Sequence, residues 1–250
     1  MGTADPKNNQ SLPLPYGLLD HCSSTFSRVL ACEYRLASSD PYPSANPFPA
    51  ALLDAVAGYN HLINDLDFFP QNVLVVGDSA GGTPVNALLK YIITLADPII
   101  PTPGGLLLVS STLDWGCTHT GPSSFWVRNE KSCFTGPILK SGYTTRSLLG
   151  TLPESEAITN LYISAGSAHF VDKHGLYEGY PRTCFVTGGA DMTLDSMISA
   201  CRAMEGDIGE ENVVYLEVKD SCHDFLTFNW HEPERTETFQ KVAQWISIVF

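Results

Sequence analysis

Ser79 lies in a short run whose residue types suit a catalytic nucleophile. Val73–Val76 is apolar and mostly β-branched, and it leads directly into Gly77-Asp78-Ser79-Ala80-Gly81-Gly82. A helical pattern of apolar residues follows at once, so the run predicts a strand, a sharp turn and a helix with the serine at the apex. We expect Gly77 and Gly81 to remove side chains that would collide with the strand and the helix.

A serine nucleophile needs a base and an acid that orients the base, and residues of both kinds follow downstream. Thr183–Thr187 has the pattern of a strand and leads through two glycines to Asp191, while the strand-like Val213–Val218 leads to His223. Because the carboxyl ends of parallel strands meet at one edge of a sheet, we expect both side chains near Ser79. The chemistry is then attack by Ser79 on an ester carbonyl, with His223 moving the proton and Asp191 holding the imidazolium.

The acid has rivals in the sequence. Asp195 lies four residues beyond Asp191, where it would join the first turn of a helix and interact favourably with the helix dipole. Asp224 adjoins His223, but neighbours in sequence rarely point the right way, so we interpret Asp224 as structural. Asp78 is either a support residue beside the elbow or a polar residue of the turn itself.

Other chemistries fit these residues poorly. Gly82 is followed by Thr83-Pro84, and the next lysine is Lys90, so the phosphate-binding P-loop pattern fails, as does the dinucleotide pattern Gly-x-Gly-x-x-Gly. The spacing of histidines, cysteines and carboxylates matches no zinc pattern. We therefore expect no metal. The remaining histidines are interpreted as structural or solvent-exposed: His21, His61, His119, His169, His174 and His231.

The motifs resemble one branch of a known family, the hormone-sensitive-lipase-like carboxylesterases of the α/β-hydrolase fold (alpha/beta hydrolase-3). The elbow at Ser79 and the chain order Ser, Asp, His are similar to that branch. So are Glu33–Ala37, Phe48–Asp54, Asp191–Asp195 and His223–Phe225, which follow the family's order from one end of the chain to the other. The resemblance implies short- to medium-chain esters as substrates and no cofactor.

One motif of the family has no counterpart in this chain. The family carries a His-Gly-Gly whose backbone N–H groups complete the oxyanion hole, and His-Gly-Gly occurs nowhere here. Met1–Pro6 resembles the segment just after that motif, so the sequence favours a truncated or mis-started esterase over a short form with another use. The backbone N–H of Ala80 is then the expected oxyanion donor, and Gly2 is the remaining candidate, although we favour a disordered terminus there. A missing central strand would also leave backbone groups unpaired unless Val29–Tyr34 pairs with Val73–Val76.

The elements that must position these residues alternate between helix and strand, which predicts an α/β architecture, and the resemblance implies an α/β-hydrolase fold with a mostly parallel sheet flanked by helices. The N-terminal strands of the fold are expected to be absent. The expected elements are a helix near Leu14–Thr25, a strand at Val29–Tyr34, a helix opened by Pro49, the elbow strand and its helix, a strand at Gly105–Ser110, the two strands before Asp191 and His223, and helices after Asp191 and at the C-terminus.

Residues 114–180 fit this alternation poorly. They are rich in Ser, Thr and Gly, contain Trp115, Phe125 and Trp126, and lie between two sheet strands. In the family an insertion at this place caps the active site, and long irregular segments tend to carry binding residues. We therefore expect a single domain over residues 1–250, with a cap-like insertion at 114–180 that supplies residues of the acyl pocket.

Composition restricts the partners. The chain has 44% hydrophobic and 16% charged residues, enough for a substantial core. Its formal net charge of −13 disfavours nucleic acid and anionic membranes as partners. Seven cysteines without a repeating spacing describe no disulfide framework, which favours a cytoplasmic protein, and no apolar run is long enough to span a bilayer.

The function predicted from the sequence is a serine carboxylic-ester hydrolase that acts on a small-molecule ester. Two alternatives remain open. One is a non-catalytic small-molecule binder on the same fold, for which the incomplete oxyanion hole argues. The other is a serine peptidase, because some peptidases share the fold and the order of the triad. The oligomeric state is not indicated.

Overall fold

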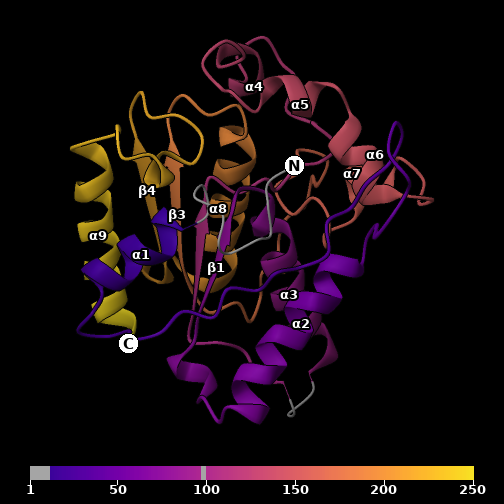
Figure 1. The fold of residues 1–250 in the computed structure, drawn as a ribbon. Coiled ribbons are helices and arrows are strands. Elements are labelled where there is room, and N and C mark those ends of the chain that lie inside the picture. The colour runs from indigo at the N-terminus through magenta and orange to yellow at the C-terminus, as the bar shows by residue number, and fades with distance from the viewer. Residues whose placement is uncertain (1–11, 97–99) are drawn as a thin grey trace.

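The computed structural model describes residues 12–96 and 100–250 (Figure 1). Its centre is a sheet in the order β1-β2-β3-β4, in which all neighbouring strands are parallel. The strands are β1 (Leu74–Asp78), β2 (Gly105–Val109), β3 (Arg182–Gly188) and β4 (Val213–Val218). Helices lie between successive strands along the chain, so the predicted α/β architecture with a parallel sheet is confirmed.

Helices cover both faces of this sheet (Figure 1). One face carries α1 (Pro13–His21) and α9 (Glu234–Val249). The other carries α2 (Ala50–Asn60), α3 (Gly82–Leu95) and α8 (Leu194–Ile208). The sheet is therefore the middle layer of three, and each of its faces lies in its own apolar core.

The strand sequences explain this layering. Successive side chains of a strand point to opposite faces, so Leu106 and Leu108 of β2 join the core under α2, α3 and α8, while Leu107 and Val109 join the core under α1 and α9. All four are at most 1% exposed. A continuous apolar run of this kind is typical of a parallel strand that is covered on both faces.

Short helical segments join the main elements. They are a π-helical segment η1 (His61–Asp65) and the 3₁₀ segments η2 (Pro70–Asn72), η3 (Ser79–Gly81), η4 (Glu210–Asn212) and η5 (Phe225–Thr227). Within residues 12–96 and 100–250, no helix combines the length and the apolar character that a membrane span requires.

The helices within residues 114–180, between β2 and β3, lie together at one end of the molecule (Figure 1). This segment contains α4 (Phe125–Arg128), α5 (Gly136–Lys140), α6 (Tyr143–Leu149) and α7 (Glu156–Thr159), and no strand. It lies against the loop and helix that follow β3, because the Phe125 N–H donates to Asp195 Oδ2 at 2.7 Å. An irregular segment was expected here, and its many short helices and loops fit that expectation.

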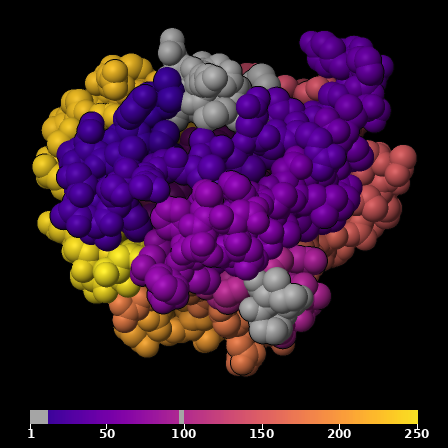
Figure 2. Space-filling model, turned by 60° about the horizontal axis from the view of Figure 1, so that its bottom comes forward, coloured from indigo at the N-terminus to yellow at the C-terminus, as the bar shows by residue number. Residues whose placement is uncertain are grey.

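The predicted strand at Val29–Tyr34 is wrong. These residues have no regular secondary structure, and Val29 and Leu30 are each 47% exposed. Figure 2 shows the described part of the N-terminal third of the chain, from residue 12 on, in indigo and violet, spread over one face of the molecule beside the yellow C-terminal residues. Strand propensity alone does not make these residues a strand, because they form no ladder with β1. Among the described residues, β1 is therefore an edge strand of the sheet.

Candidate active site

The sequence around Ser79 folds into a strand–turn–helix elbow. β1 ends at Asp78, η3 contains the serine, and α3 begins at Gly82. Ser79 has a φ of 52°, a left-handed conformation that L-residues rarely adopt and that holds its side chain at the apex of the turn. The elbow itself is therefore as the sequence predicts.

The reason for the elbow glycines is only partly as expected. A Cβ on Gly77 would lie 2.4 Å from Val85 Cγ2 and 2.8 Å from the Cα of Gly82, so Gly77 is needed for the predicted reason. A Cβ on Gly81 would meet nothing within 4 Å, so the expected collision there is wrong. The tight position is Gly82, whose Cβ would lie 2.3 Å from that of Ser111. Gly82 thus lets α3 approach the chain that follows β2.

Three side chains from separate loops meet beyond the carboxyl ends of the strands. The Ser79 Oγ lies 2.8 Å from His223 Nε2, and His223 Nδ1 lies 2.7 Å from Asp191 Oδ2. Ser79 follows β1, Asp191 follows β3 and His223 follows β4, so the parallel register brings all three to one edge of the sheet. The structure thus places the three predicted residues in one hydrogen-bonded series.

Burial and charge act together on this series. Asp191 and His223 are 0% and 1% exposed. Burial alone would raise the pKa of Asp191, but His223 and the Thr193 N–H, 2.9 Å from Asp191 Oδ1, lower it below its usual value. Burial alone would lower the pKa of His223, but the carboxylates of Asp191 and Asp224 outweigh it and raise that pKa well above its usual value. The pair therefore favours a carboxylate that stabilises an imidazolium.

The rival acids occupy different places. Asp195 Oδ2 accepts the backbone N–H of Phe125, so Asp195 joins the start of α4 to the start of α8. Asp78 is half-buried, and desolvation of its carboxyl together with the Asp224 carboxylate raises the pKa of Asp78 well above its usual value. Of the predicted acids, Asp191 is the one whose carboxylate faces His223 Nδ1.

Sequence reasoning missed how closely Asp224 approaches the site. Its Oδ2 lies 3.3 Å from His223 Nε2, on the same side of the ring as Ser79. Asp224 has a φ of 54°, and its N–H donates to Ser110 Oγ at 3.0 Å. That turn brings the side chain back toward the neighbouring histidine. Asn and Asp are favoured in left-handed turns, and this was the only local signal for the geometry.

Sequence reasoning also missed Cys133 and Phe134, which come from residues 114–180. The Cys133 thiol lies 3.6 Å from Asp191 Oδ1, and the Phe134 ring packs edge-on against the His223 ring with centroids 5.7 Å apart. No local pattern marks either residue, because their place depends on how this segment packs against the sheet.

An apolar pocket lies next to the elbow. Its lining includes Phe48, Leu52, Ala80, Thr83, Pro84 and Trp115. The Trp115 indole N–H donates to Thr83 Oγ1 at 2.7 Å, which fixes the indole against the first turn of α3. Ala80 is in η3 at the start of that helix, where first-turn N–H groups lack helical acceptors. Gly2, the other oxyanion candidate, lies outside the described residues.

A parallel sheet between helical layers, with a serine elbow and with an acid and a histidine after later strands, defines the α/β-hydrolase class. A family model described as alpha/beta hydrolase fold matches residues 17–227. The chain therefore belongs to the alpha/beta hydrolase fold family, and the family predicted from the sequence motifs is confirmed.

Known relatives agree with this fold. The chain is 37% identical over 95 residues to an acetyl-hydrolase of Streptomyces hygroscopicus, a match that covers 37% of this chain and 28% of that protein. A hormone-sensitive lipase from a metagenome library superposes with a TM-score of 0.76 at 20% identity, over 96% of this chain and 72% of that one. The esterase EstE5, in a crystal soaked with p-nitrophenyl butyrate, superposes with a TM-score of 0.73 at 21% identity, over 100% and 72% of the two chains.

Proposed function

We propose that this chain is a serine carboxylic-ester hydrolase that acts on short- to medium-chain esters through an acyl-enzyme. The observation that carries the proposal is the hydrogen-bonded series from Ser79 Oγ through His223 to Asp191. In it Ser79 is the nucleophile, His223 is the general base and then the general acid, and Asp191 orients His223.

The reaction follows from this geometry. The Ser79 Oγ attacks the ester carbonyl while His223 Nε2 accepts its proton, and Asp191 stabilises the imidazolium through Nδ1–H. His223 then protonates the leaving alcohol, and water repeats the sequence to release the acid. The backbone N–H of Ala80 donates to the oxyanion. In the family a second donor comes from His-Gly-Gly, which does not occur in this sequence, and one such donor is worth about 10²- to 10³-fold in kcat in serine hydrolases.

The pocket beside Ala80 suits an apolar substrate group of modest size. Its walls come from residues 34–48, α2, α3 and residues 114–180, which supports a cap-like role for residues 114–180 within a single domain over residues 1–250. The acetyl-hydrolase relative and the p-nitrophenyl butyrate soak of EstE5 fit short acyl chains. All seven cysteines are free, which fits the cytoplasmic location that we include in this proposal.

Hydrolysis of a p-nitrophenyl ester series from acetate to decanoate tests the proposal. We expect the highest turnover for the shorter esters and its loss in Ser79→Ala. Circular dichroism of both proteins controls for folding.

A folded chain whose ester turnover is the same as that of Ser79→Ala would contradict the proposal. The missing His-Gly-Gly then favours the second candidate, a non-catalytic binder of small molecules in the apolar pocket. Cleavage of peptide substrates in preference to esters would instead favour a serine peptidase.

A further inference from the structure

Cys133 is held against the Asp191–His223 pair by a dedicated set of contacts. The amide of Asn129 donates to the backbone carbonyls of Gly189 and Asp191, each at 2.9 Å. The hydroxyl of Ser132 donates to the carbonyl of Ala190 at 3.0 Å. These bonds dock the loop between α4 and α5 onto the loop after β3, and they leave Cys133 3% exposed.

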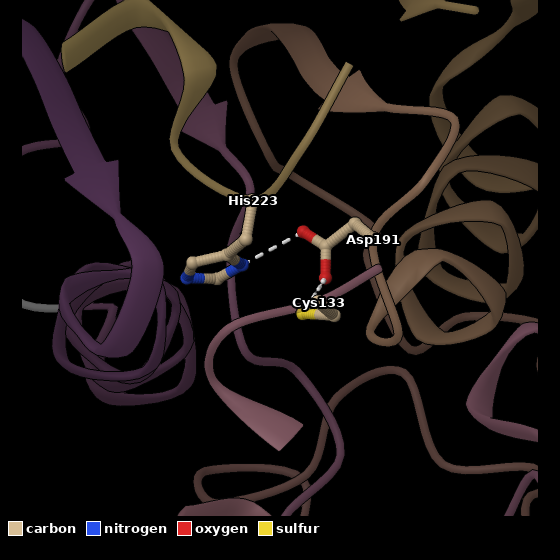
Figure 3. Close-up of side chains that lie close together, drawn as sticks. All are labelled: Cys133, Asp191 and His223. Carbon is tan, nitrogen blue, oxygen red and sulfur yellow. Dashed lines mark hydrogen bonds and ion pairs between the residues drawn. The ribbon is translucent and has the colours of Figure 1, made fainter. Parts of the chain in front are cut away.

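Three different metal-binding atoms meet there (Figure 3). One carboxylate oxygen of Asp191 faces His223 Nδ1, and the other faces the Cys133 thiol. One donor atom from each residue lies within 4.8 Å of the other two. Tetrahedral zinc, with bonds of about 2.0 to 2.3 Å, places its donor atoms roughly 3.3 to 3.8 Å apart. Small side-chain shifts would therefore bring these three atoms into the geometry of a zinc site.

We propose that Cys133, Asp191 and His223 bind a thiophilic divalent cation, with Zn²⁺ as the best match, and that this cation switches off the enzyme. A thiolate, an imidazole and a carboxylate are a ligand set that suits zinc and that selects against Mg²⁺ and Ca²⁺. Thr135 Oγ1 lies 3.0 Å from the Cys133 sulfur and is a further oxygen next to this ligand. The binding step stands on this donor set alone, while the inhibition rests on the proposed function.

The protons balance as follows. The Cys133 thiol loses its proton to solvent, and the cation takes the place of the proton on His223 Nδ1, which moves by way of solvent to Nε2. Thiolate, carboxylate and a divalent cation then sum to no net charge in the buried cluster. The affinity of this cluster for the cation is expected to rise with pH, because binding of the cation releases protons.

Inhibition follows from the tautomer of His223. Catalysis needs the proton on Nδ1, facing Asp191, and a free lone pair on Nε2, facing Ser79. A cation on Nδ1 forces the proton of neutral imidazole onto Nε2. That Nε2–H has two acceptors, Ser79 Oγ at 2.8 Å and Asp224 Oδ2 at 3.3 Å. Asp224 therefore stabilises the metal-bound tautomer, in which His223 can no longer accept the serine proton.

Cobalt binding tests the site without any need for activity. The full chain, reduced with a thiol-free reductant and freed of metal by EDTA, is titrated with Co²⁺, whose bond to a thiolate gives a charge-transfer band in the near ultraviolet. We expect one equivalent to produce this band and Zn²⁺ to displace it. We expect Cys133→Ala and the closer isostere Cys133→Ser to lose the band. Ser79→Ala is expected to keep it.

Cys222→Ala is the matched control, because the Cys222 thiol is beside the same histidine but points to the His223 carbonyl, 3.3 Å away. It is expected to keep the band. A band that persists in both Cys133 variants, or that disappears in Cys222→Ala alone, would overturn the site.

A second experiment measures the rate of ester hydrolysis as a function of Zn²⁺ concentration, with Mg²⁺ as the hard-cation control. Loss of an outer-shell partner costs roughly 10- to 100-fold in metal affinity, so loss of the thiol ligand in Cys133→Ser is expected to raise the half-inhibitory Zn²⁺ concentration by at least that factor. An active chain with equal zinc sensitivity in both proteins would overturn the inhibition. A chain without Ser79-dependent turnover would contradict the proposed function instead, and the cobalt titration would still test the site.

Discussion

Two strand-like segments of the chain have different structures. β3 and Val29–Tyr34 are both apolar, strand-like runs that contain a cysteine. β3 is paired on both sides, by β2 and β4, and Phe185 within it is 0% exposed. Val29–Tyr34 lies at the surface without a ladder. The difference teaches that a strand-like sequence becomes a strand here only where a neighbouring strand satisfies its backbone groups.

A difference in burial separates the two halves of the candidate site. Asp191 follows the central strand β3 and His223 follows β4, and both side chains are almost completely buried. Ser79 follows β1, which like β4 is an edge strand among the described residues, and Ser79 and Ala80 are half-buried. The acid–base pair is therefore the packed half of the site, and the serine and the oxyanion region form the more open half.

The largest expected effect is on the acid of the packed half. Asp191→Asn keeps the size of the side chain but places an amide where His223 Nδ1–H needs an acceptor carboxylate, so kcat for an ester is expected to fall by about 10⁴-fold, as in other serine hydrolases. Asp195→Asn is the matched control, because its side-chain oxygen still accepts the Phe125 N–H. Steady-state kinetics checks both. Equal losses in the two variants would contradict the assignment of the acid.

The next prediction compares the stability contributed by β3 with that contributed by residues 29–34. Phe185→Ala removes a fully buried side chain from β3 and is expected to lower the free energy of unfolding by about 3–5 kcal/mol. Leu30→Ala removes a side chain that is 47% exposed, and a change within about 0.5 kcal/mol is expected. Urea denaturation measures both. A large loss in Leu30→Ala would show that residues 29–34 are packed in solution.

Two adjacent glycines test which position of the elbow has no room for a side chain. Gly82→Ala would place its Cβ 2.3 Å from that of Ser111, so a loss of about 1–3 kcal/mol from overpacking is expected. Gly81→Ala meets nothing within 4 Å at a φ of −67°, so a gain of about 0.4–1 kcal/mol is expected from the reduced entropy of the unfolded chain. Thermal denaturation measures the unfolding temperature of both variants. Shifts of the same sign would contradict the assignment of the close contact to Gly82 and not to Gly81.

The smallest effect concerns the N-terminal segment. The Arg35 guanidinium donates to the Asp54 carboxylate at 2.8 Å, and this ion pair lowers the pKa of Asp54. Because the folded pKa is lowered, the pair stabilises the fold at neutral pH and loses its effect as pH falls through that pKa. Arg35 is 52% exposed, so Arg35→Gln is expected to lower the unfolding midpoint only slightly at pH 7 and not at all at acid pH or in high salt. A difference that persists in acid would contradict the ion-pair explanation.

Much of the fold was predictable because its signals are local. The apolar runs at β1 to β4, the elbow at Ser79 and the helix after Asp191 each depend on periodicity or on turn residues within about ten positions. The strand at Val29–Tyr34 was predicted wrongly, since its formation depends on a partner and not on its own propensity. The collision predicted at Gly81 was wrong for a related reason, because the close contact comes from Ser111 and falls on Gly82.

The sequence by itself determined the alternation of strands and helices, the serine at a strained turn, and an acid and a histidine after later strands. Only the tertiary structure decided that Asp191, and not Asp195, faces His223, that Asp224 turns back toward Nε2, and that Cys133 completes a cluster with the pair. The physical reason is the distance along the chain over which each kind of interaction acts. Backbone preference and apolar periodicity act between near neighbours, whereas these contacts join loops that meet only after the sheet and residues 114–180 have packed.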